Sequence, residues 1–331
     1  MNNKISIIGA GAWGTTLAML LTENNYEVKI WTYEKEVAEQ INSFKENKTY
    51  LNGFPLSSKI EAFNSMEDCL TGAAIVFIVV PSEHFRKTLK QAAKYLKDQT
   101  LVIATKGIEI GTGKRMSEIA QEETELKNIV VISGPNLSKE IAKGKPAAAV
   151  AASPSKICAE KIQNILMQER FRVYTSDDVA GIEISGALKN IIAISAGVCD
   201  ALNLGDNAKA SLLVRGLAEI ARLGKKIGAK AETFNGLSGM GDLIATCASP
   251  LSRNHQVGFR IGKGEKLDEI KKDMKSIAEG VPTCKAVYSL AKKLKVEMPI
   301  TEETFRVLFE GKAPYQAISE LMQRKPKKEV E

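Results

Sequence analysis

The sequence predicts an α/β domain with a doubly wound, mainly parallel sheet in residues 1–188, followed by an all-helical domain in residues 189–331. In the first domain, short β-branched runs alternate with helical stretches, a pattern typical of parallel strands joined by helices. After about residue 180, Ile184, Leu188 and Ile191 recur at three- and four-residue spacing, which indicates helices. A length of 331 residues also agrees with two domains.

Five apolar runs are expected to be the strands of the sheet. Their nearly continuous apolar content is typical of parallel strands that are covered by helices on both faces. Because parallel strands end at the same edge of a sheet, the turns that follow them should share one crevice. The helix expected over residues 185–197 is itself a candidate connection between the two domains. The five runs are residues 5–8, 28–31, 75–80, 101–104 and 129–133.

The composition excludes several classes of protein. With 44% apolar and 26% charged residues, the chain is expected to form a packed core and not to be disordered. The five cysteines are scattered and the chain has only two histidines, so we expect reduced thiols, no metal site and no serine-type catalytic triad. The net charge of +7 comes from lysines spread along the chain, which does not indicate a nucleic-acid-binding segment. A basic groove for a phosphate-bearing small molecule explains this charge equally well.

The chain is expected to be cytoplasmic, with no stable insertion into a membrane. No run approaches the roughly 18 to 20 continuous apolar residues that a bilayer requires. The first expected strand runs directly into a glycine turn, unlike a signal peptide. The basic end at residues 324–328 is expected to be a solvated tail, with membrane anchoring as the alternative.

A glycine-rich turn follows the first expected strand and opens a helical stretch. Gly9, Gly11 and Gly14 have the G-x-G-x-x-G spacing of a dinucleotide-binding turn. The tight turn requires Gly9, close approach of a pyrophosphate requires Gly11, and close helix-strand packing requires Gly14. With a helix N-terminus facing the pyrophosphate, this pattern predicts a Rossmann-type domain that binds NAD or NADP. A glycine turn that only connects the strand to the helix is the structural alternative.

The residues after the second strand bear on the choice between NAD and NADP. An acidic residue at this place favours the ribose hydroxyls of NAD. Glu34 follows Tyr33 here and favours NAD. An ordinary surface glutamate explains Glu34 equally well.

Other unusual residues follow the remaining strands. Pro81, Lys106, Gly134 and Asn136 each come shortly after an expected strand, so they should border the same crevice. Lys106 is a candidate contact for a charged substrate. An isolated lysine in a loop is more often solvated, so this interpretation depends on the neighbours of Lys106.

The helical half contains a lysine in apolar surroundings. Lys189 and Asn190 stand inside an apolar helical stretch. Desolvation there would lower the pKa of a lysine and suit it to proton exchange. The alternative is a lysine that extends its ammonium group to solvent.

A glycine-dense segment, residues 235–243, lies further along the helical half. Its glycines would bring the backbone close to another group, and Asp242 would pair with a lysine. Arg253 follows shortly afterwards and offers a planar guanidinium for phosphate oxygens. A purely structural loop is the alternative for this segment.

In order and combination, these motifs resemble those of the bacterial NAD(P)-dependent glycerol-3-phosphate dehydrogenases over nearly the whole chain. Each motif alone is common, but the combination is specific. The matching segments are Gly9-Ala10-Gly11-Ala12-Trp13-Gly14-Thr15, Thr105-Lys106-Gly107, Gly134-Pro135, Ala187-Leu188-Lys189-Asn190, Gly239-Met240-Gly241-Asp242-Leu243, Ser252-Arg253-Asn254 and Ala278-Glu279-Gly280.

The resemblance implies reversible, NAD(P)H-dependent reduction of dihydroxyacetone phosphate to sn-glycerol 3-phosphate, which supplies glycerophospholipid synthesis. It implies that Lys189 exchanges the proton, with Lys106 and Asp242 beside it as catalytic residues. The substrate contacts implied are Lys106, Gly134, Asn136, Lys189, Asp242, Thr246, Ser252, Arg253 and Asn254. The cofactor contacts expected are Gly9, Gly11, Ala12, Trp13, Gly14, Tyr33, Pro81, Lys106, Ser138, Arg253 and Glu279.

The chain departs from the family pattern at two places. The family often has a serine and then an aromatic residue after Gly-Pro, where this chain has Asn136 and Leu137. This difference bears on the substrate contact expected at Asn136. The family also often carries a basic residue near Tyr33, so the sequence does not support a preference for NADPH.

Two other functions are compatible with parts of the pattern. A two-domain dehydrogenase acting on β-hydroxy acids would also join a Rossmann domain to a helical domain with a catalytic lysine, but it would accept a carboxylate substrate. A dinucleotide-sensing regulator would need a DNA-binding segment or a partner surface, and no separate DNA-binding segment is evident. A homodimer is the default expectation for a soluble assembly.

Overall fold

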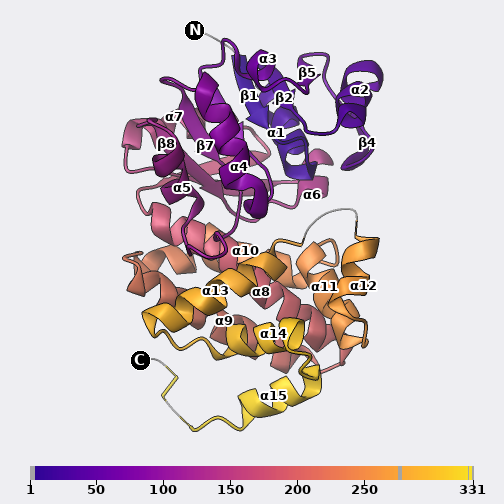
Figure 1. The fold of residues 1–331 in the computed structure, drawn as a ribbon, viewed down its shortest axis with the longest axis vertical. Coiled ribbons are helices and arrows are strands. Elements are labelled where there is room, and N and C mark those ends of the chain that lie inside the picture. The colour runs from indigo at the N-terminus through magenta and orange to yellow at the C-terminus, as the bar shows by residue number, and fades with distance from the viewer. Residues whose placement is uncertain (1–3, 275–277, 327, 330–331) are drawn as a thin grey trace.

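An eight-stranded sheet forms the centre of the N-terminal half of the computed structural model, which describes residues 4–274, 278–326 and 328–329 (Figure 1). The strand order is β10-β9-β8-β7-β6-β1-β2-β5. Neighbouring strands are parallel except for β8 and β9. The strands are β1 (Lys4–Ile8), β2 (Glu27–Trp31), β5 (Ile60–Phe63), β6 (Ile75–Ile78), β7 (Thr100–Ile103), β8 (Ile129–Ser133), β9 (Ala147–Ala152) and β10 (Phe171–Ser176), with a separate hairpin of β3 (Glu46–Asn47) and β4 (Leu51–Pro55).

The strand order makes the sheet doubly wound. The chain proceeds from β1 outward to β2 and β5, then returns to the other side of β1 and continues through β6, β7 and β8. The direction therefore reverses between β1 and β6, and in such sheets ligands bind outside the carboxyl ends of the strands at this point. The predicted doubly wound, mainly parallel sheet is confirmed, and the five predicted strands correspond to β1, β2, β6, β7 and β8.

The sequence patterns did not predict three strands of this sheet. β9 consists of alanines with a single valine, and alanine has little preference for strands. β10 and β5 are the two edge strands, and both contain exposed residues. These three strands form because they pair with their neighbours, which local apolar patterns do not reveal.

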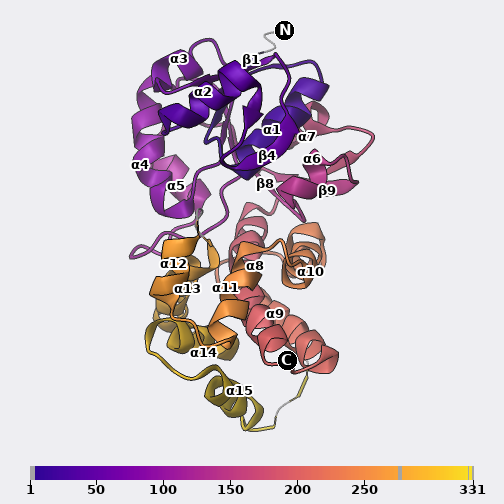
Figure 2. The same ribbon diagram turned by 90° about the vertical axis from the view of Figure 1, so that its right-hand side faces the viewer.

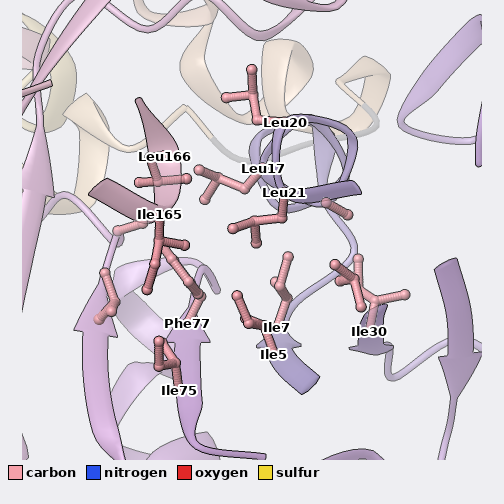
Figure 3. Packing of buried hydrophobic residues seen from close by; sticks show 14 of the residues in the cluster. Ile5, Ile7, Leu17, Leu20, Leu21, Ile30, Ile75, Phe77, Ile165 and Leu166 are labelled. Carbon is pink, nitrogen blue, oxygen red and sulfur yellow. The ribbon is translucent and has the colours of Figure 1, made fainter. Parts of the chain in front are cut away.

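Helices cover both faces of the sheet. On one face, Leu17 and Leu21 of α1 and Ile165 of α7 pack with Ile7 and Phe77 of the strands (Figure 3). On the other face, α4 and α5 bury their apolar sides against the same strands. This double coverage explains the continuous apolar runs of the central strands. The helices of this half are α1 (Ala12–Glu23), α2 (Lys35–Phe44), α3 (Met66–Leu70), α4 (Ser82–Ala92), α5 (Met116–Glu123), α6 (Ser138–Ala142) and α7 (Lys156–Leu166).

The C-terminal half is built around helix α8, and α9, α10, α11, α13 and α14 pack around it (Figure 2). From residue 178 onward the described residues contain no strand, which confirms the predicted all-helical half. The α-helices are α8 (Val179–Ala201), α9 (Asp206–Lys226), α10 (Asp242–Ala248), α11 (Arg253–Gly262), α12 (Leu267–Asp273), α13 (Gly280–Leu294), α14 (Pro299–Phe309) and α15 (Pro314–Met322).

Helix α8 joins the two halves of the molecule. Its first turns pack against β8 of the sheet, so residue 188 lies inside the helix that leaves the sheet. The buried Glu183 of α8 accepts hydrogen bonds from Arg115 at 2.9 Å and from the hydroxyl of Ser117 at 2.5 Å. These bonds hold α8 against the loop and helix that follow β7. Gly258 lets α11 cross α8 closely, because a Cβ there would lie only 1.8 Å from a backbone oxygen of α8.

By length and composition, α8 could span a membrane, although the sequence was expected to contain no such segment. Its 23 residues include a stretch with a mean hydropathy of 1.4, and 89% of that stretch is buried inside the protein. A helix surrounded by other helices is apolar on all sides, so burial in a protein core accounts for its composition.

The basic end of the chain contacts the helical half. Arg215 of α9 donates a hydrogen bond to the carbonyl oxygen of Glu329 at 3.0 Å, and Arg324 pairs with Glu297. Lys327, which belongs to the expected solvated tail, lies outside the described residues. The described part of the tail is therefore exposed but turns back along α9.

Candidate active site

The glycine turn after β1 has the geometry of a dinucleotide site. Gly9 has a φ of 115°, in the region that favours glycine, and a Cβ there would lie 2.7 Å from the carbonyl oxygen of Val79. A Cβ at Gly14 would lie 1.9 Å from the carbonyl oxygen of Gly9. In contrast, a Cβ at Gly11 would meet no protein atom within 4 Å. Gly11 therefore faces open space at the N-terminus of α1, where a pyrophosphate would bind.

The other expected cofactor residues lie near the same edge of the sheet or at helix starts. Ala12 and Trp13 form the first turn of α1, and Trp13 is half-buried against the core. Pro81 immediately precedes α4, and Ser138 begins α6. Tyr33 follows β2, and 84% of its surface is exposed.

Glu34 is held in place by neighbouring hydroxyl groups. Its two carboxylate oxygens accept hydrogen bonds from Tyr50 at 2.7 Å and from Thr32 at 2.9 Å. Burial acts to raise the pKa of Glu34, but these two bonds and a backbone hydrogen bond together outweigh burial and keep the pKa below its ordinary value. Glu34 is thus an ionised carboxylate of fixed position beyond β2.

Lys106 reaches from the turn after β7 toward the helical half. Its Nζ donates hydrogen bonds to the carbonyl oxygen of Gly134 at 3.0 Å and to Oδ2 of Asp242 at 2.7 Å. Gly134 has a φ of 137°, and a Cβ there would lie 2.9 Å from the carbonyl oxygen of Ala148. The structure therefore brings Lys106, Gly134 and Asp242 together from three distant parts of the sequence.

Lys189 lies buried in α8 on the other side of the same carboxylate. Its Nζ is 2.5 Å from Oδ1 of Asp242 and 2.6 Å from the hydroxyl oxygen of Thr246. The Thr246 hydroxyl in turn donates to Asp242 at 3.2 Å. One carboxylate thus lies between two ammonium groups, which leaves the cluster with an excess of positive charge. Such a cluster suits an anionic substrate.

The surroundings of Lys189 favour proton exchange. Burial lowers the pKa of Lys189 to about 8, and the positive charge of Lys106 acts in the same direction. The negative charge of Asp242 opposes this shift. The sequence left two interpretations of Lys189, a desolvated lysine and a lysine that extends its ammonium group to solvent. The structure favours the desolvated lysine, because the residue is only 7% exposed.

The glycine-dense segment places Asp242 at the start of a helix. Residues Leu237–Gly241 form a π-helical turn that leads directly into α10, whose first residue is Asp242. A Cβ at Gly239 would lie 2.1 Å from the carbonyl oxygen of Phe234. This glycine therefore allows a close approach within the protein backbone, as a structural loop would, while Asp242 contributes the charged group.

Arg253 is the first residue of α11, where the helix N-terminus adds positive potential. Its side chain makes no hydrogen bond or ion pair with the residues that the structure describes, and the residue is exposed. Surrounding protein nevertheless partly desolvates the guanidinium and lowers its pKa, while the charge of Glu279 opposes this. The Ser252 hydroxyl accepts a bond from the backbone of His255 at 3.3 Å and so caps α11. A free guanidinium at a helix N-terminus is suited to phosphate.

Asn254 connects three helices. Its side-chain nitrogen donates to Oδ1 of Asn190 at 2.9 Å, and its oxygen accepts from the backbone of Gly280 at 2.8 Å. Because Asn190 follows Lys189 and Asn254 follows Arg253, this bond fixes the two charged residues relative to each other. The sequence identifies Asn190 only as a polar neighbour of Lys189. A polar residue beside a lysine in an apolar helix was the available signal.

Glu279 links the helical half to the sheet half. Its carboxylate accepts hydrogen bonds from the hydroxyl of Ser82 at 2.5 Å and from the backbone of Ser82 at 3.2 Å. Ser82 begins α4, directly after Pro81. Burial raises the pKa of Glu279 to about 7, and these bonds and the charge of Arg253 oppose that rise. The sequence does not predict that Ser82 binds Glu279, because a single serine at the start of a helix is not a specific motif.

Asn136 has an unusual environment. Both polar atoms of its side chain are buried, and neither has a hydrogen-bond partner within the described residues. Buried amides without partners are rare in proteins because desolvation is costly. Asn136 lies two residues after Gly134, whose carbonyl oxygen accepts a hydrogen bond from Lys106. A ligand in the crevice would satisfy the amide.

The described residues offer no set of side chains that could bind a metal ion. These residues contain no group of three or more His, Cys, Asp or Glu side chains that could hold a metal ion. All five cysteines are buried and free. The cluster around Asp242 is therefore an arrangement of ammonium, carboxylate and hydroxyl groups.

Both halves of the chain match known protein families. Residues 4–159 match the N-terminal domain of NAD-dependent glycerol-3-phosphate dehydrogenase, and residues 178–319 match its C-terminal domain. The chain belongs to this family. It is an NAD(P)-dependent oxidoreductase, and the open glycine turn at Gly11 fits this cofactor.

Individual members of the glycerol-3-phosphate dehydrogenase family are similar over nearly their whole length. Glycerol-3-phosphate dehydrogenase [NAD(P)+] of Bacillus cytotoxicus is 47% identical, with 99% of this chain and 97% of the relative covered. The solved structure of the Coxiella burnetii enzyme has 36% identity and a TM-score of 0.94, and covers 97% of this chain and 99% of its own. The Saccharomyces cerevisiae enzyme has 26% identity and a TM-score of 0.82, with the same coverage.

Proposed function

We propose that this chain catalyses the reversible reduction of dihydroxyacetone phosphate to sn-glycerol 3-phosphate with NADH or NADPH. The observation that carries this proposal is the contact of the buried Lys189 with Asp242 and Thr246, beside a second ammonium group, that of Lys106. A lysine with a pKa of about 8 can both donate and accept a proton near neutral pH. The names of the relatives support the choice of substrate.

In the proposed mechanism, Lys189 is the proton donor of the reduction. When bound, a reduced nicotinamide would supply the hydride that the carbonyl carbon requires. As negative charge develops on the carbonyl oxygen, the ammonium group of Lys189 donates its proton to that oxygen. Asp242 fixes the direction of the ammonium group through its 2.5 Å contact. In the oxidative direction the neutral amine of Lys189 accepts the proton, so oxidation should be faster at higher pH.

Arg253 is proposed to bind the substrate phosphate. Its guanidinium has no partner in the described part of the chain and stands at the N-terminus of α11. Binding energy from this remote phosphate would hold the reacting carbonyl at Lys189. Asn254, Ser252 and Gly134 are proposed to act mainly through position, since their polar groups already bond within the protein.

The cofactor is proposed to lie along the carboxyl edge of the sheet, at the reversal between β1 and β6. Its pyrophosphate would approach Gly11 at the start of α1, flanked by Ala12, Trp13 and the packed Gly9 and Gly14. The further contacts proposed along this edge are Tyr33, Pro81, Lys106, Ser138, Arg253 and Glu279.

The enzyme is further proposed to work in the cytoplasm and to supply glycerophospholipid synthesis. A homodimer is proposed because it is the commonest symmetric assembly. The domain division is proposed to be residues 1–188 and 189–331, with α8 crossing the boundary.

The test is a direct assay of the purified chain. Absorbance of NADH and of NADPH is followed on addition of dihydroxyacetone phosphate, with dihydroxyacetone as the phosphate-free control and a β-keto acid as the alternative substrate. Loss of absorbance only with the phosphorylated ketone is the expected result, and the two rates rank the cofactors. Activity with the keto acid alone would overturn the proposal.

A further inference from the structure

The helical half contains a cavity that the proposed reaction does not use. Its volume is about 810 Å³, and it lies between α8, α9, α14, α15 and the chain end. No residue assigned to the active site lines this cavity. Most of its wall is apolar, with Val198, Leu212, Val307, Leu308, Ile318 and Leu321 among the lining residues.

Polar groups inside the cavity already have partners within the protein. The hydroxyl groups of Ser195 and Thr304 bond to each other at 2.7 Å. The carboxylate of Glu219 accepts from the backbone of Ile300 at 2.6 Å, and Ser211 donates to a backbone oxygen of its own helix. The interior therefore offers a ligand apolar surface but few free hydrogen-bonding groups, which favours a hydrocarbon chain over a polar metabolite.

The rim of the cavity is positively charged. Arg215, Arg222, Arg324, Lys325 and Lys328 all line it. The three arginines contact the backbone of Glu329, the backbone of Glu297 and the carboxylate of Glu297, respectively. Lys325 and Lys328 have no hydrogen bond or ion pair with any described residue.

The acidic groups at the cavity do not cancel this charge. The carboxylate of Glu303 already pairs with Arg306 at 2.9 Å and with Lys312 at 2.5 Å. Glu219 is bonded to backbone groups of α14. Glu329 is the remaining acidic residue of the lining. An anionic headgroup at the rim would find two unpaired ammonium groups.

Helix α15 gives a second reason for expecting an apolar ligand. It is amphipathic, and Ala317, Ile318 and Leu321 face the cavity across from α9. Two apolar helix faces that border an unfilled space gain stability when an apolar group fills that space. The volume falls in the range of about 300–1,000 Å³ that holds single small ligands.

We propose that this cavity binds a single-chain lipid with an anionic headgroup, with the chain between α9 and α15 and the headgroup at Lys325 and Lys328. The proposal goes beyond the dehydrogenase reaction and requires no chemical step. It adds a lipid site to an enzyme whose proposed product can receive an acyl chain on a hydroxyl group.

The binding test uses the full chain and 1-oleoyl-sn-glycerol 3-phosphate below its aggregation concentration, in a calorimetric titration. The neutral 1-oleoylglycerol is the control for charge. Saturable binding of the anionic lipid, about tenfold or more tighter than that of the neutral lipid, is the expected result. Equal affinity for both lipids, or no binding of either, would overturn the proposal.

Two pairs of variants locate the binding. Ser211→Trp should fill the cavity from an exposed position on α9 and abolish lipid binding. Ser289→Trp is the matched control, because Ser289 is also exposed and also bonds to the backbone of its own helix. The double variant K325E/K328E should weaken binding about tenfold or more, whereas K271E/K272E on α12 makes the same charge change elsewhere and should not. Unchanged affinity in Ser211→Trp would contradict the proposed site.

Two further measurements separate this proposal from others. Arg253→Ala removes the proposed substrate-phosphate contact and should leave lipid affinity unchanged, so a loss of binding in this variant would place the lipid in the active site instead. Sedimentation of the wild type and of Ser211→Trp tests a second copy of the chain as the occupant. Dissociation of an oligomer by Ser211→Trp would overturn the lipid proposal.

Discussion

The Nζ atom of Lys189 lies 2.5 Å from Oδ1 of Asp242, whose other carboxylate oxygen accepts a hydrogen bond from Lys106. The two lysines come from different halves of the molecule, and Asp242 comes from the start of α10. A shared carboxylate therefore holds two positive charges close together. Burial, and then this second positive charge, lowers the pKa of Lys189 to about 8, while Asp242 limits the shift.

Replacement of Lys189 by methionine should remove the proton donor. The unbranched apolar side chain fills similar space, so the fold should persist. We expect kcat for dihydroxyacetone phosphate reduction to fall by about 10²- to 10⁴-fold, with little change in the Kd for NADH. Lys209→Met on α9 is the control, since Lys209 pairs with Asp200 outside the cluster. Near-normal turnover of Lys189→Met would remove Lys189 from the mechanism.

Replacement of Asp242 by asparagine should shift the pH dependence of the reaction. The negative charge of Asp242 raises the pKa of Lys189, so its removal should bring that pKa below about 8. Reduction requires the ammonium form, and the fall of kcat at high pH should therefore begin at lower pH than in the wild type. Thr246→Val, which keeps all charges, should shift the pH profile less. An identical profile in Asp242→Asn and wild type would contradict this electrostatic role.

Replacement of Arg253 by alanine should weaken the binding of phosphorylated substrate. A charged hydrogen bond contributes about 1.5–3 kcal/mol, which corresponds to a rise in KM of roughly 10- to 150-fold. Dihydroxyacetone lacks the phosphate, so its slow reduction should be nearly unaffected. Arg260→Ala in the same helix is the control, because Arg260 pairs with Glu265 and Asp273. A parallel loss with both substrates would show that Arg253 does not act through the phosphate.

Two glycines of the dinucleotide turn should respond differently to substitution by alanine. At Gly11 a Cβ meets no protein atom within 4 Å, so Gly11→Ala should cost less than about 1 kcal/mol of stability. It should nevertheless raise the Kd for NADH, because the methyl group takes the place of the pyrophosphate. At Gly14 a Cβ lies 1.9 Å from a backbone oxygen, so Gly14→Ala should lower stability by about 3 kcal/mol. Thermal unfolding and fluorescence titration with NADH measure both effects, and tight NADH binding by Gly11→Ala would place the pyrophosphate elsewhere.

Glu219 should make the protein less stable as pH rises. Burial raises the pKa of Glu219 to about 7 from 4.5, although hydrogen bonds from the backbone of Ile300 and Thr301 oppose this. Between these two values the native state keeps the proton that the unfolded state releases, so the free energy of unfolding falls as pH increases. Glu219→Gln should remove this contribution, and its stability relative to the wild type should increase from pH 4.5 to pH 7. Urea unfolding at several pH values tests this, with the exposed Glu61→Gln as a control that should follow the wild type.

The sequence by itself determined those features of the fold and of the cofactor site that depend on local patterns. The apolar runs of β1, β2, β6, β7 and β8, the spacing of Gly9, Gly11 and Gly14, and the helical periodicity after residue 180 were all readable along the chain. The motifs were specific enough in combination to indicate the dehydrogenase family. Local patterns suffice here because strand burial, glycine turns and helix periodicity each act over a few neighbouring residues.

Only the tertiary structure decided how distant residues act on one another. The pKa of Lys189 depends on its burial and on Lys106 and Asp242, which lie 83 and 53 residues away in the chain. The bond from Asn254 to Asn190 and the contact of Glu279 with Ser82 likewise join separate helices. The alanine-rich β9 and the cavity between α9 and α15 also exist only through packing. Burial, charge and cavity shape are properties of segments brought together in space, so they cannot be read from the local pattern of the sequence.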